Sequence, residues 1–217
     1  MHIRSATFVK SCPTIDDLPQ DNRPQIACFG RSNVGKSSFI NCLVQSQTLS
    51  RVSRTPGRTE FLNIFLVNGD WYLVDLPGYG YAKQSKDKRQ GLESLIYTYL
   101  QTKPTLAIVI IDSNIGPTKL DEETLAFLES EGIPHFLLAN KIDKQSNNTR
   151  TNTEFALRKN YPNAKLFLTS AKKGDGRNED LTALDYHLQH GPRPEKKIRP
   201  ASHRALGVDD TAPFILP

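Results

Sequence analysis

Short apolar runs alternate with longer amphipathic segments along most of the chain. The apolar runs predict strands at residues 4–11, 25–29, 61–67, 71–74, 105–111, 134–139 and 165–169. Apolar positions at helical spacing predict helices at residues 38–44, 87–101, 120–130, 152–161 and 181–189. Because strands and helices follow one another repeatedly, the pattern predicts an α/β fold, with a mainly parallel sheet and helices on both of its faces.

One turn in this pattern is unusually specific. Asn68-Gly69-Asp70 separates the runs at residues 61–67 and 71–74. Asn-Gly is a strong hairpin signal, since both residues tolerate the positive φ that a tight turn requires. These two strands are therefore expected to be antiparallel and to form one edge of the sheet.

A phosphate-binding pattern follows the second apolar run. The segment from Gly30 to Ser37 matches G-x-x-x-x-G-K-[ST] at every fixed position. Gly30 and Gly35 let the backbone curl and turn its N–H groups toward phosphate oxygens. Lys36 then supplies a positive charge to the outer phosphates, and the Ser37 hydroxyl faces a magnesium ion. The helix that follows directs the partial positive charge of its N-terminus at the same oxygens.

A second motif, Asp-Leu-Pro-Gly at residues 75–78, follows the strand at 71–74. Ligands of open α/β sheets bind beyond the carboxyl ends of the strands, so this position suits a nucleotide site. Asp75 can hold a water molecule bound to magnesium, and the N–H of Gly78 can meet the terminal phosphate.

Two further motifs at strand ends concern the base. Residues 140–143 read Asn-Lys-Ile-Asp, and residues 169–172 read Thr-Ser-Ala-Lys. The carboxylate of Asp143 can accept hydrogen bonds from the N1–H and 2-amino group of guanine, whereas adenine offers no donors there. The apolar stem of Lys141 can lie over the base, and the N–H of Ala171 can reach the guanine O6. The nucleotide is therefore expected to carry guanine.

Composition bounds the class of protein. Hydrophobic residues make up 37% of the chain and charged residues 24%, as in a soluble protein. The apolar runs are too short to cross a bilayer, and no signal-peptide core follows Met1, so a cytoplasmic location is expected. Cys12, Cys28 and Cys42 fit neither a disulfide framework nor a zinc site.

The net charge is +5 and the last residues differ in composition from the rest. We expect one nucleotide-binding domain over residues 1–190 and a basic, proline-rich, disordered tail over residues 191–217. The basic residues of this tail are Arg193, Lys196, Lys197, Arg199 and Arg204. Contact with a polyanion and simple solubility are both open explanations for them.

The order of the four motifs is similar to that of translation-factor-class small GTPases. The stretches Gly-Arg-Ser-Asn-Val-Gly-Lys-Ser-Ser at 30–38, Thr-Pro-Gly-Arg-Thr at 55–59 and Asp-Leu-Pro-Gly-Tyr-Gly-Tyr-Ala at 75–82 resemble the bacterial EngB (YsxC/YihA) GTPases. These belong to the TrmE-Era-EngA-EngB-septin-like superfamily. The resemblance spans about residues 4–189 and implies a Ras-like P-loop GTPase domain with a mostly parallel six-stranded sheet and one antiparallel edge.

The resemblance also implies which residues bind GTP, GDP and Mg²⁺. Thr59 would be the switch residue whose hydroxyl closes on magnesium in the GTP state, and the metal set would be Ser37, Thr59 and Asp75. The catalytic set would be Lys36, Thr59, Gly78 and Asn33. The nucleotide-binding set is Gly30, Arg31, Ser32, Asn33, Val34, Gly35, Lys36, Ser37, Ser38, Gly57, Arg58, Thr59, Glu60, Phe61, Asp75, Leu76, Pro77, Gly78, Asn140, Lys141, Ile142, Asp143, Thr169, Ser170 and Ala171.

Slow intrinsic hydrolysis is expected, because Tyr79 stands where Ras-type enzymes carry the glutamine that orients the attacking water. Asn33 and Tyr79 together motivate the hypothesis that K⁺ assists, since in related GTPases an Asn at this loop position ligates a potassium ion. A turn-forming role for Asn33 is an equally open reading.

The resemblance implies a monomeric switch, without membrane insertion, that acts in large ribosomal subunit assembly and is needed for normal cell division and septation. Basic residues in two segments would suit contact with ribosomal RNA: Arg51, Arg54, Arg58, Lys83, Lys86, Lys88 and Arg89. Solubility is the alternative explanation of these charges. Two other functions remain open. One is a GTP-gated regulator of the division machinery that does not touch RNA, and the other is a P-loop kinase or ATPase, which the motif from Asn140 to Asp143 opposes.

Overall fold

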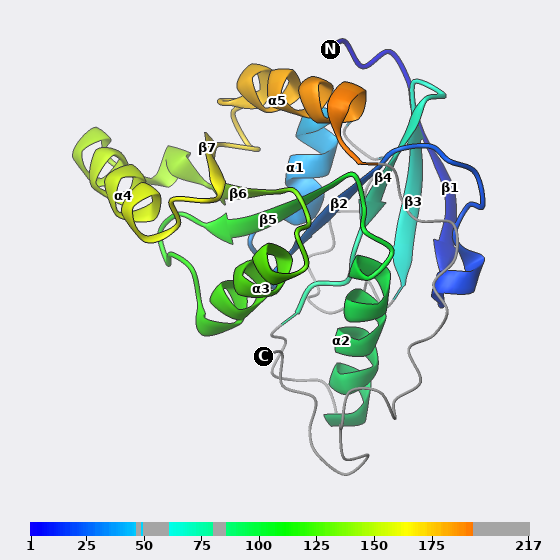
Figure 1. Ribbon diagram of the computed structural model, residues 1–217. Helices are drawn as coiled ribbons and strands as arrows, with labels where there is room; N and C mark the ends of the chain where they lie inside the picture. Colours follow the sequence, from blue (N-terminus) through cyan, green and yellow to red (C-terminus); the bar gives the residue numbers. More distant parts are fainter. Residues whose placement is uncertain (47–48, 50–60, 80–85, 193–217) are drawn as a thin grey trace.

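The chain forms a seven-stranded sheet flanked by five α-helices in the described part of a computed structural model (Figure 1). The structure describes residues 1–46, 49, 61–79 and 86–192, apart from the side chains of residues 86–89. The strands are β1 (Ala6–Cys12), β2 (Gln25–Gly30), β3 (Leu62–Val67), β4 (Trp71–Asp75), β5 (Leu106–Asp112), β6 (His135–Asn140) and β7 (Lys165–Thr169). The helices are α1 (Lys36–Leu43), α2 (Lys86–Leu100), α3 (Lys119–Ser130), α4 (Asn147–Asn160) and α5 (Arg177–His190), with short 3-10 helices η1 (Ile15–Asp17) and η2 (Ile142–Lys144).

The strand order is β1-β3-β4-β2-β5-β6-β7, with parallel pairing from β4 to β7 and an antiparallel edge at β1 and β3. The predicted α/β class is confirmed, and the seven strands match the seven apolar runs, whereas the six strands implied by the family resemblance are one too few. The N-terminal run joins the sheet as a seventh strand because Asn68 ties it to the hairpin. The Asn68 Oδ1 accepts hydrogen bonds from the N–H groups of Arg4 (2.8 Å) and Ser5 (3.2 Å), and its Nδ2 donates to the carbonyl of His2 (2.9 Å).

The hairpin prediction at Asn68 and Gly69 is confirmed. Both residues have positive φ, 53° and 77°, and β3 and β4 pair in antiparallel register from Val67 opposite Trp71. Positive φ at two successive turn residues gives the turn the right-handed twist of its flanking strands, which explains the choice of Asn-Gly.

The sheet carries a hydrophobic core on each face. Helices α2, α3 and α4 cover one face, where Tyr99, Leu128 and Leu157 are buried, and α1 and α5 cover the other with Phe39 and Leu184 (Figure 1). Alternate residues of β2 enter opposite cores, and all six of its residues are buried. A strand covered on both faces needs apolar side chains on both, which is why its sequence shows little alternation.

Two helices begin earlier than their apolar spacing predicts. Helix α4 starts at Asn147, not residue 152, because the Ser146 hydroxyl caps it by accepting a hydrogen bond from the Thr149 N–H at 3.2 Å. Helix α5 starts at Arg177, not residue 181, directly after Gly176, whose φ is 83°. Both first turns are polar, so hydrophobic periodicity could not reveal them.

The topology places one loop at the centre of the molecule. Strand β2 lies between β4 and β5: the chain adds β3 and β4 on one side of it and then, after α2, adds β5 on the other side. In open α/β sheets such a reversal opens a crevice at the carboxyl ends of the strands. The loop after β2 lies in that position. Among the described residues, no helix is long and apolar enough to cross a membrane.

Candidate functional site

The loop between β2 and α1 has the backbone that its two glycines predict. Gly35 has a φ of 97° and directly precedes α1. A Cβ at Gly35 would lie 2.4 Å from Nδ2 of Asn140, and a Cβ at Gly30 would lie 2.2 Å from the carbonyl oxygen of Ile110. Neither position can hold a side chain without displacing its neighbours. Asn33 also has positive φ, 72°, which fits its reading as a turn former.

The phosphate end of the site pairs Lys36 with Asp75. The Lys36 ammonium forms an ion pair with the Asp75 carboxylate, and both side chains are buried. Asp75 is the last residue of β4 and Lys36 the first of α1, so the fold brings the two motifs together. The Asp75 carboxylate offers the oxygen ligands that Mg²⁺ prefers, although the ion would have to compete with the Lys36 ammonium for them. Asp75 and the hydroxyl of Ser37 would hold the ion.

Gly78 lies against the phosphate loop. A Cβ there would come within 3.3 Å of the Ser32 Oγ and 3.5 Å of the Gly30 carbonyl oxygen. The absent side chain therefore lets the backbone of the Asp-Leu-Pro-Gly motif approach the loop closely.

Asn140 joins the two halves of the site. Its Nδ2 donates to the carbonyl of Val34 at 3.0 Å, and its Oδ1 accepts from the N–H of Ala171 at 3.0 Å. The side chain is 2% exposed, so both hydrogen bonds are shielded from water. The Ala171 N–H that the sequence assigns to guanine O6 thus donates to Asn140 in this structure, and a base would have to compete for it.

Lys141 connects three segments in a similar way. With a φ of 70°, it places its Nζ 2.5 Å from the carbonyl oxygen of Asn33 and 2.7 Å from Oδ2 of Asp112. These bonds hold its aliphatic stem across the gap between the phosphate loop and the end of β5. Burial alone would raise the pKa of Asp112. The hydrogen bonds that Asp112 accepts from Lys141 and Asn114 outweigh burial and keep this pKa below its usual value.

Asp112 is a site residue that no sequence motif identifies. It is the last residue of β5, directly opposite Asn140 in the parallel register. The sequence does contain one indication of this role, because Asp112 is a carboxylate at the carboxyl end of a buried apolar strand. It fits no recognised motif, so only its contact with Lys141 reveals its role as a positioning residue.

Asp143 is ready to accept hydrogen bonds. Its Oδ1 receives one from the Ser170 hydroxyl at 2.7 Å, and this bond is the main reason that the pKa of the carboxyl is lowered. Asp143 therefore stays ionised at neutral pH, and the second carboxylate oxygen has the chemistry that the N1–H and 2-amino group of guanine require.

Part of the assigned site lies outside the described residues: Gly57, Arg58, Thr59 and Glu60. The same holds for Arg51, Arg54 and Lys83 and for the side chains of Lys86, Lys88 and Arg89. The remaining assigned residues gather at the carboxyl ends of β2, β4, β6 and β7.

A buried acid supports the loop around Ala171. Asp180 of α5 is 3% exposed, and its Oδ2 accepts a hydrogen bond from the Thr169 hydroxyl at 3.1 Å. Burial raises its pKa to about 7. The folded state thus holds this proton more tightly than the unfolded chain does, so ionisation of Asp180 removes stability as the pH rises from 3.8 to about 7.

We expect Asp180→Asn to remove this pH dependence. The free energy of unfolding of the variant relative to the wild type should rise by about 1–4 kcal/mol between pH 4.5 and pH 8, since one pKa unit corresponds to about 1.4 kcal/mol. Urea unfolding at the two pH values measures the difference. The exposed Asp175→Asn variant is the control, and an equal difference at both pH values for Asp180→Asn would contradict the expectation.

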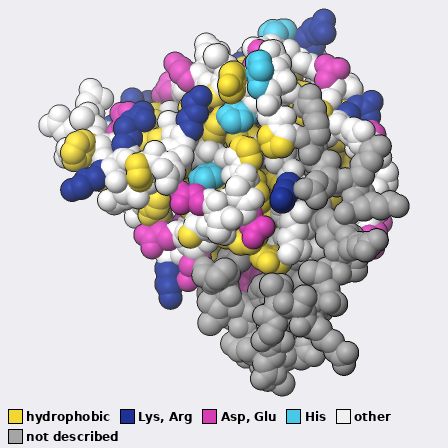
Figure 2. Space-filling view, viewed as in Figure 1, with side chains coloured by type: hydrophobic (Ala, Val, Ile, Leu, Met, Phe, Trp, Pro, Cys, Tyr) yellow, Lys and Arg dark blue, Asp and Glu magenta, His cyan; other side chains and the backbone are white. Residues whose placement is uncertain are grey.

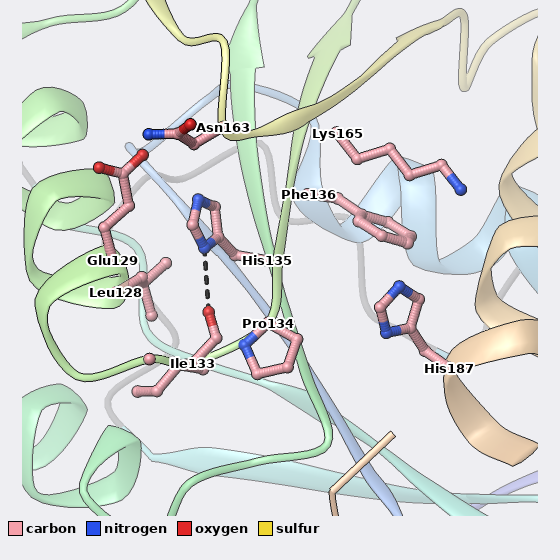
Figure 3. Close-up of a pocket in the computed structure, with 10 residues that line it drawn as sticks. Leu128, Glu129, Ile133, Pro134, His135, Phe136, Asn163, Lys165 and His187 are labelled. Atoms are coloured by element: carbon pink, nitrogen blue, oxygen red, sulfur yellow. Dashed lines mark hydrogen bonds between the residues drawn. The ribbon is translucent and has the colours of Figure 1, made fainter. Parts of the chain in front are cut away.

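A hollow at the opposite end of the sheet does not belong to this site. It has a volume of about 490 Å³ and lies at the start of β6 and β7, where Phe136, Lys165 and His187 line it (Figure 3). The Nδ1 of His135 lies 3.0 Å from the carbonyl oxygen of Ile133 at its wall (Figure 3). Because the four motifs lie at the carboxyl ends of the strands, this hollow is separate from them.

Comparison with known proteins identifies the family. Residues 25–141 match the family described as "50S ribosome-binding GTPase". The "Probable GTP-binding protein EngB" of Pelotomaculum thermopropionicum is 42% identical over 189 residues, which cover 85% of this chain and 96% of that protein. The protein of the same name from Lactobacillus acidophilus is 44% identical over 161 residues, covering 73% and 82%.

Solved structures agree on the fold. A crystal structure of a probable GTP-binding protein engB superposes with a TM-score of 0.62 at 23% identity, covering 76% of this chain and 98% of that one. A variant of Aquifex aeolicus Era bound to GDP.AlF4- superposes with a TM-score of 0.66 at 24% identity, covering 81% and 59%. With its phosphate loop, its guanine motifs and these relatives, the chain belongs to the EngB family of GTP-binding proteins and is a GTPase with a Ras-like fold.

Proposed function

We propose that the chain is a GTP-dependent switch that docks on a precursor of the large ribosomal subunit and leaves it after hydrolysis. The double hydrogen bond of Asn140 to the phosphate loop and to Ala171 carries the switch part of the proposal, because it assembles phosphate and base recognition into one site. Membership of a family described as ribosome-binding supports the ribosomal part.

In this proposal the assigned residues share the work of binding and hydrolysis. Lys36 offsets phosphate charge, Gly78 donates its N–H to the terminal phosphate, and Asp143 selects guanine. Asp75, Ser37 and Thr59 would hold Mg²⁺, which supplies charge neutralisation at the phosphates. Hydrolysis is slow because Tyr79 occupies the position of a water-orienting glutamine.

In this proposal, contact with ribosomal RNA is made by the basic residues of the two segments named above, among them Arg51, Arg54, Arg58 and Lys83. On the face shown in Figure 2, Lys and Arg side chains are interspersed with Asp and Glu over the described residues. The described residues on that face therefore show no broad basic patch, and the proposal rests on the basic residues at positions 51–58 and 83–89. In the same proposal the protein is a cytoplasmic monomer that is needed for normal cell division. Residues 191–217 form a basic tail outside the nucleotide-binding domain.

The test is co-sedimentation with purified large subunits across a salt series, with a non-hydrolysable GTP analogue or GDP bound. Binding should favour the GTP analogue and fall steeply with salt, since each neutralised phosphate releases counterions. An Arg51→Glu and Arg54→Glu double variant should lose binding, and a matched Arg4→Glu and Arg158→Glu double variant should keep it. Failure to bind in both states, with guanine nucleotide affinity intact, would overturn the ribosomal function and favour a GTP-gated partner of the division machinery.

The potassium hypothesis can be separated from the turn-forming role of Asn33. We expect hydrolysis to be several-fold faster in K⁺ than in Na⁺, and we expect Asn33→Gly to abolish this ratio in a protein that still binds GDP. Glycine tolerates the φ of 72° at this position, and the backbone carbonyl that contacts Lys141 remains. Single-turnover rates in the two salts measure the ratio. Equal wild-type rates in Na⁺ and K⁺ would dismiss the hypothesis.

A further inference from the structure

Tyr79, the residue that follows Gly78, is held at two points. Its carbonyl oxygen accepts a hydrogen bond from the N–H of Ser32 in the phosphate loop at 3.0 Å. Its phenol is buried and donates to Oδ1 of Asp121 on α3 at 2.5 Å. The backbone at Tyr79 is thus fixed to the phosphate loop, and its side chain is fixed to a helix.

The acceptor on α3 is itself rigid. Asp121 is 2% exposed, and its other oxygen, Oδ2, accepts from the N–H (2.8 Å) and the hydroxyl (2.7 Å) of Thr118 at the start of the helix. Both carboxylate oxygens are therefore engaged, one with the helix cap and one with Tyr79. A buried carboxylate with every oxygen bonded holds its partners in a defined geometry, since any movement would leave an unsatisfied charge.

The phenol remains a donor throughout the neutral range. Burial, followed by the neighbouring Asp121 carboxylate, raises the pKa of Tyr79 well above its usual value. The phenol is thus a neutral hydroxyl, and it is directed at α3. Its contribution to hydrolysis must act through the backbone of its neighbours.

Gly78 is the neighbour on which it acts. Gly78 lies so close to the phosphate loop that a Cβ would meet the Ser32 Oγ at 3.3 Å, and the next residue bonds that same Ser32 through its carbonyl. The backbone at Gly78 is thus confined between the phosphate loop and the anchored Tyr79. Errors of about 1 Å in such a group can cost on the order of 100-fold in rate.

We propose that the Tyr79–Asp121 hydrogen bond positions the Gly78 N–H for GTP hydrolysis, which makes Tyr79 and Asp121 positioning residues for kcat and not for nucleotide affinity. The inference concerns the GTPase reaction and does not depend on ribosome binding. It predicts a split between two measurable quantities. The rate of hydrolysis with GTP bound should fall when the bond is removed, while the dissociation constant for GDP, which lacks the terminal phosphate, should stay nearly the same.

Tyr79→Phe keeps the ring and removes only the hydroxyl. We expect its single-turnover hydrolysis rate to fall about tenfold and its dissociation constant for GDP to stay within about twofold of the wild type. Asp121→Asn should give a similar loss, because an amide has a single oxygen to share between Tyr79 and Thr118. The double variant should be no slower than the slower single variant, since both remove the same interaction.

Two controls match these variants. Tyr161→Phe removes a hydroxyl that donates to Glu122 of the same helix at 3.0 Å, and Thr118→Val removes one donor from the Asp121 Oδ2. Tyr161→Phe should hydrolyse GTP at the wild-type rate, and Thr118→Val, which keeps the N–H bond to Oδ2 and the Tyr79 bond, should lose less rate than Asp121→Asn. All rates are measured per GDP-binding molecule and below the thermal transition of each variant, so loss of folded protein does not count as loss of rate.

The proposal is overturned if Tyr79→Phe hydrolyses GTP at the wild-type rate or faster. It is also overturned if GDP affinity falls in parallel with the rate, or if the losses of the two single variants multiply in the double variant. If Tyr79→Phe does not fold, Asp121→Asn compared with Thr118→Val carries the same test.

Discussion

Asp143→Asn is expected to change the base preference of the site from guanine to xanthine. In the proposed site the carboxylate would accept from the N1–H and 2-amino group of guanine, whereas an amide would present an N–H₂ that matches the 2-oxo group of xanthine. Affinity for GDP should fall on the order of 1000-fold or more, because a site built for hydrogen bonds rejects a ligand that leaves them unpaired. Competition of GDP and xanthosine diphosphate against a fluorescent nucleotide measures the change.

The matched control for this variant is Ser170→Ala. It removes the hydrogen bond that the Ser170 hydroxyl donates to Asp143 at 2.7 Å but leaves the carboxylate in place. Affinity for GDP should fall only modestly, and guanine should still be preferred. Unchanged guanine preference in Asp143→Asn would show that another group reads the base, and the assignment of Asp143 would then be wrong.

Gly35→Ala is expected to abolish nucleotide binding and to destabilise the protein. The added Cβ would lie 2.4 Å from Nδ2 of Asn140, at a φ of 97° that alanine rarely adopts. Displacement of Asn140 breaks its bonds to Val34 and Ala171, so the phosphate and base ends of the site separate. We expect a loss of about 2–4 kcal/mol in the free energy of unfolding, from backbone strain and the broken buried hydrogen bonds together.

Gly116→Ala separates strain from steric clash. Gly116 has a similar φ of 78°, but no atom lies within 4 Å of the Cβ that a substitution would add. This variant should lose only about 1–2 kcal/mol and should bind GDP normally. Urea unfolding and GDP titration of the two variants measure the contrast. Equal losses of stability, or intact GDP binding in Gly35→Ala, would contradict the role given to the contact with Asn140.

Many of the secondary-structure elements can be predicted from local sequence. The hairpin at Asn68 and Gly69 is confirmed because its two turn residues need no distant partner to prefer positive φ. The strand at residues 165–169 has the observed bounds of β7, since its apolar run is bracketed by polar residues. The starts of α4 and α5 were misplaced because Ser146 and Gly176 set them through capping geometry and not through apolar spacing.

Other features depend on residues that meet only after folding. Asp112 and Lys141 are distant in sequence, and their 2.7 Å contact exists because β5 and β6 lie side by side in parallel register. The bond between Tyr79 and Asp121 likewise crosses from the end of the Asp-Leu-Pro-Gly motif to a helix 42 residues later. Neither pair has a characteristic spacing, so no pattern in one sequence could predict it.

The sequence alone determined the fold class, the phosphate loop and the preference for guanine, because each depends on residue types within a few positions of one another. The tertiary structure decided the pairing of the N-terminal strand with β3, the ion pair of Lys36 with Asp75, and the bridge that Asn140 forms between the two halves of the site. These are contacts between the ends of different strands and loops. Which of these residues meet depends on the spatial order of the strands in the sheet, and that order is set by the packing of the whole fold.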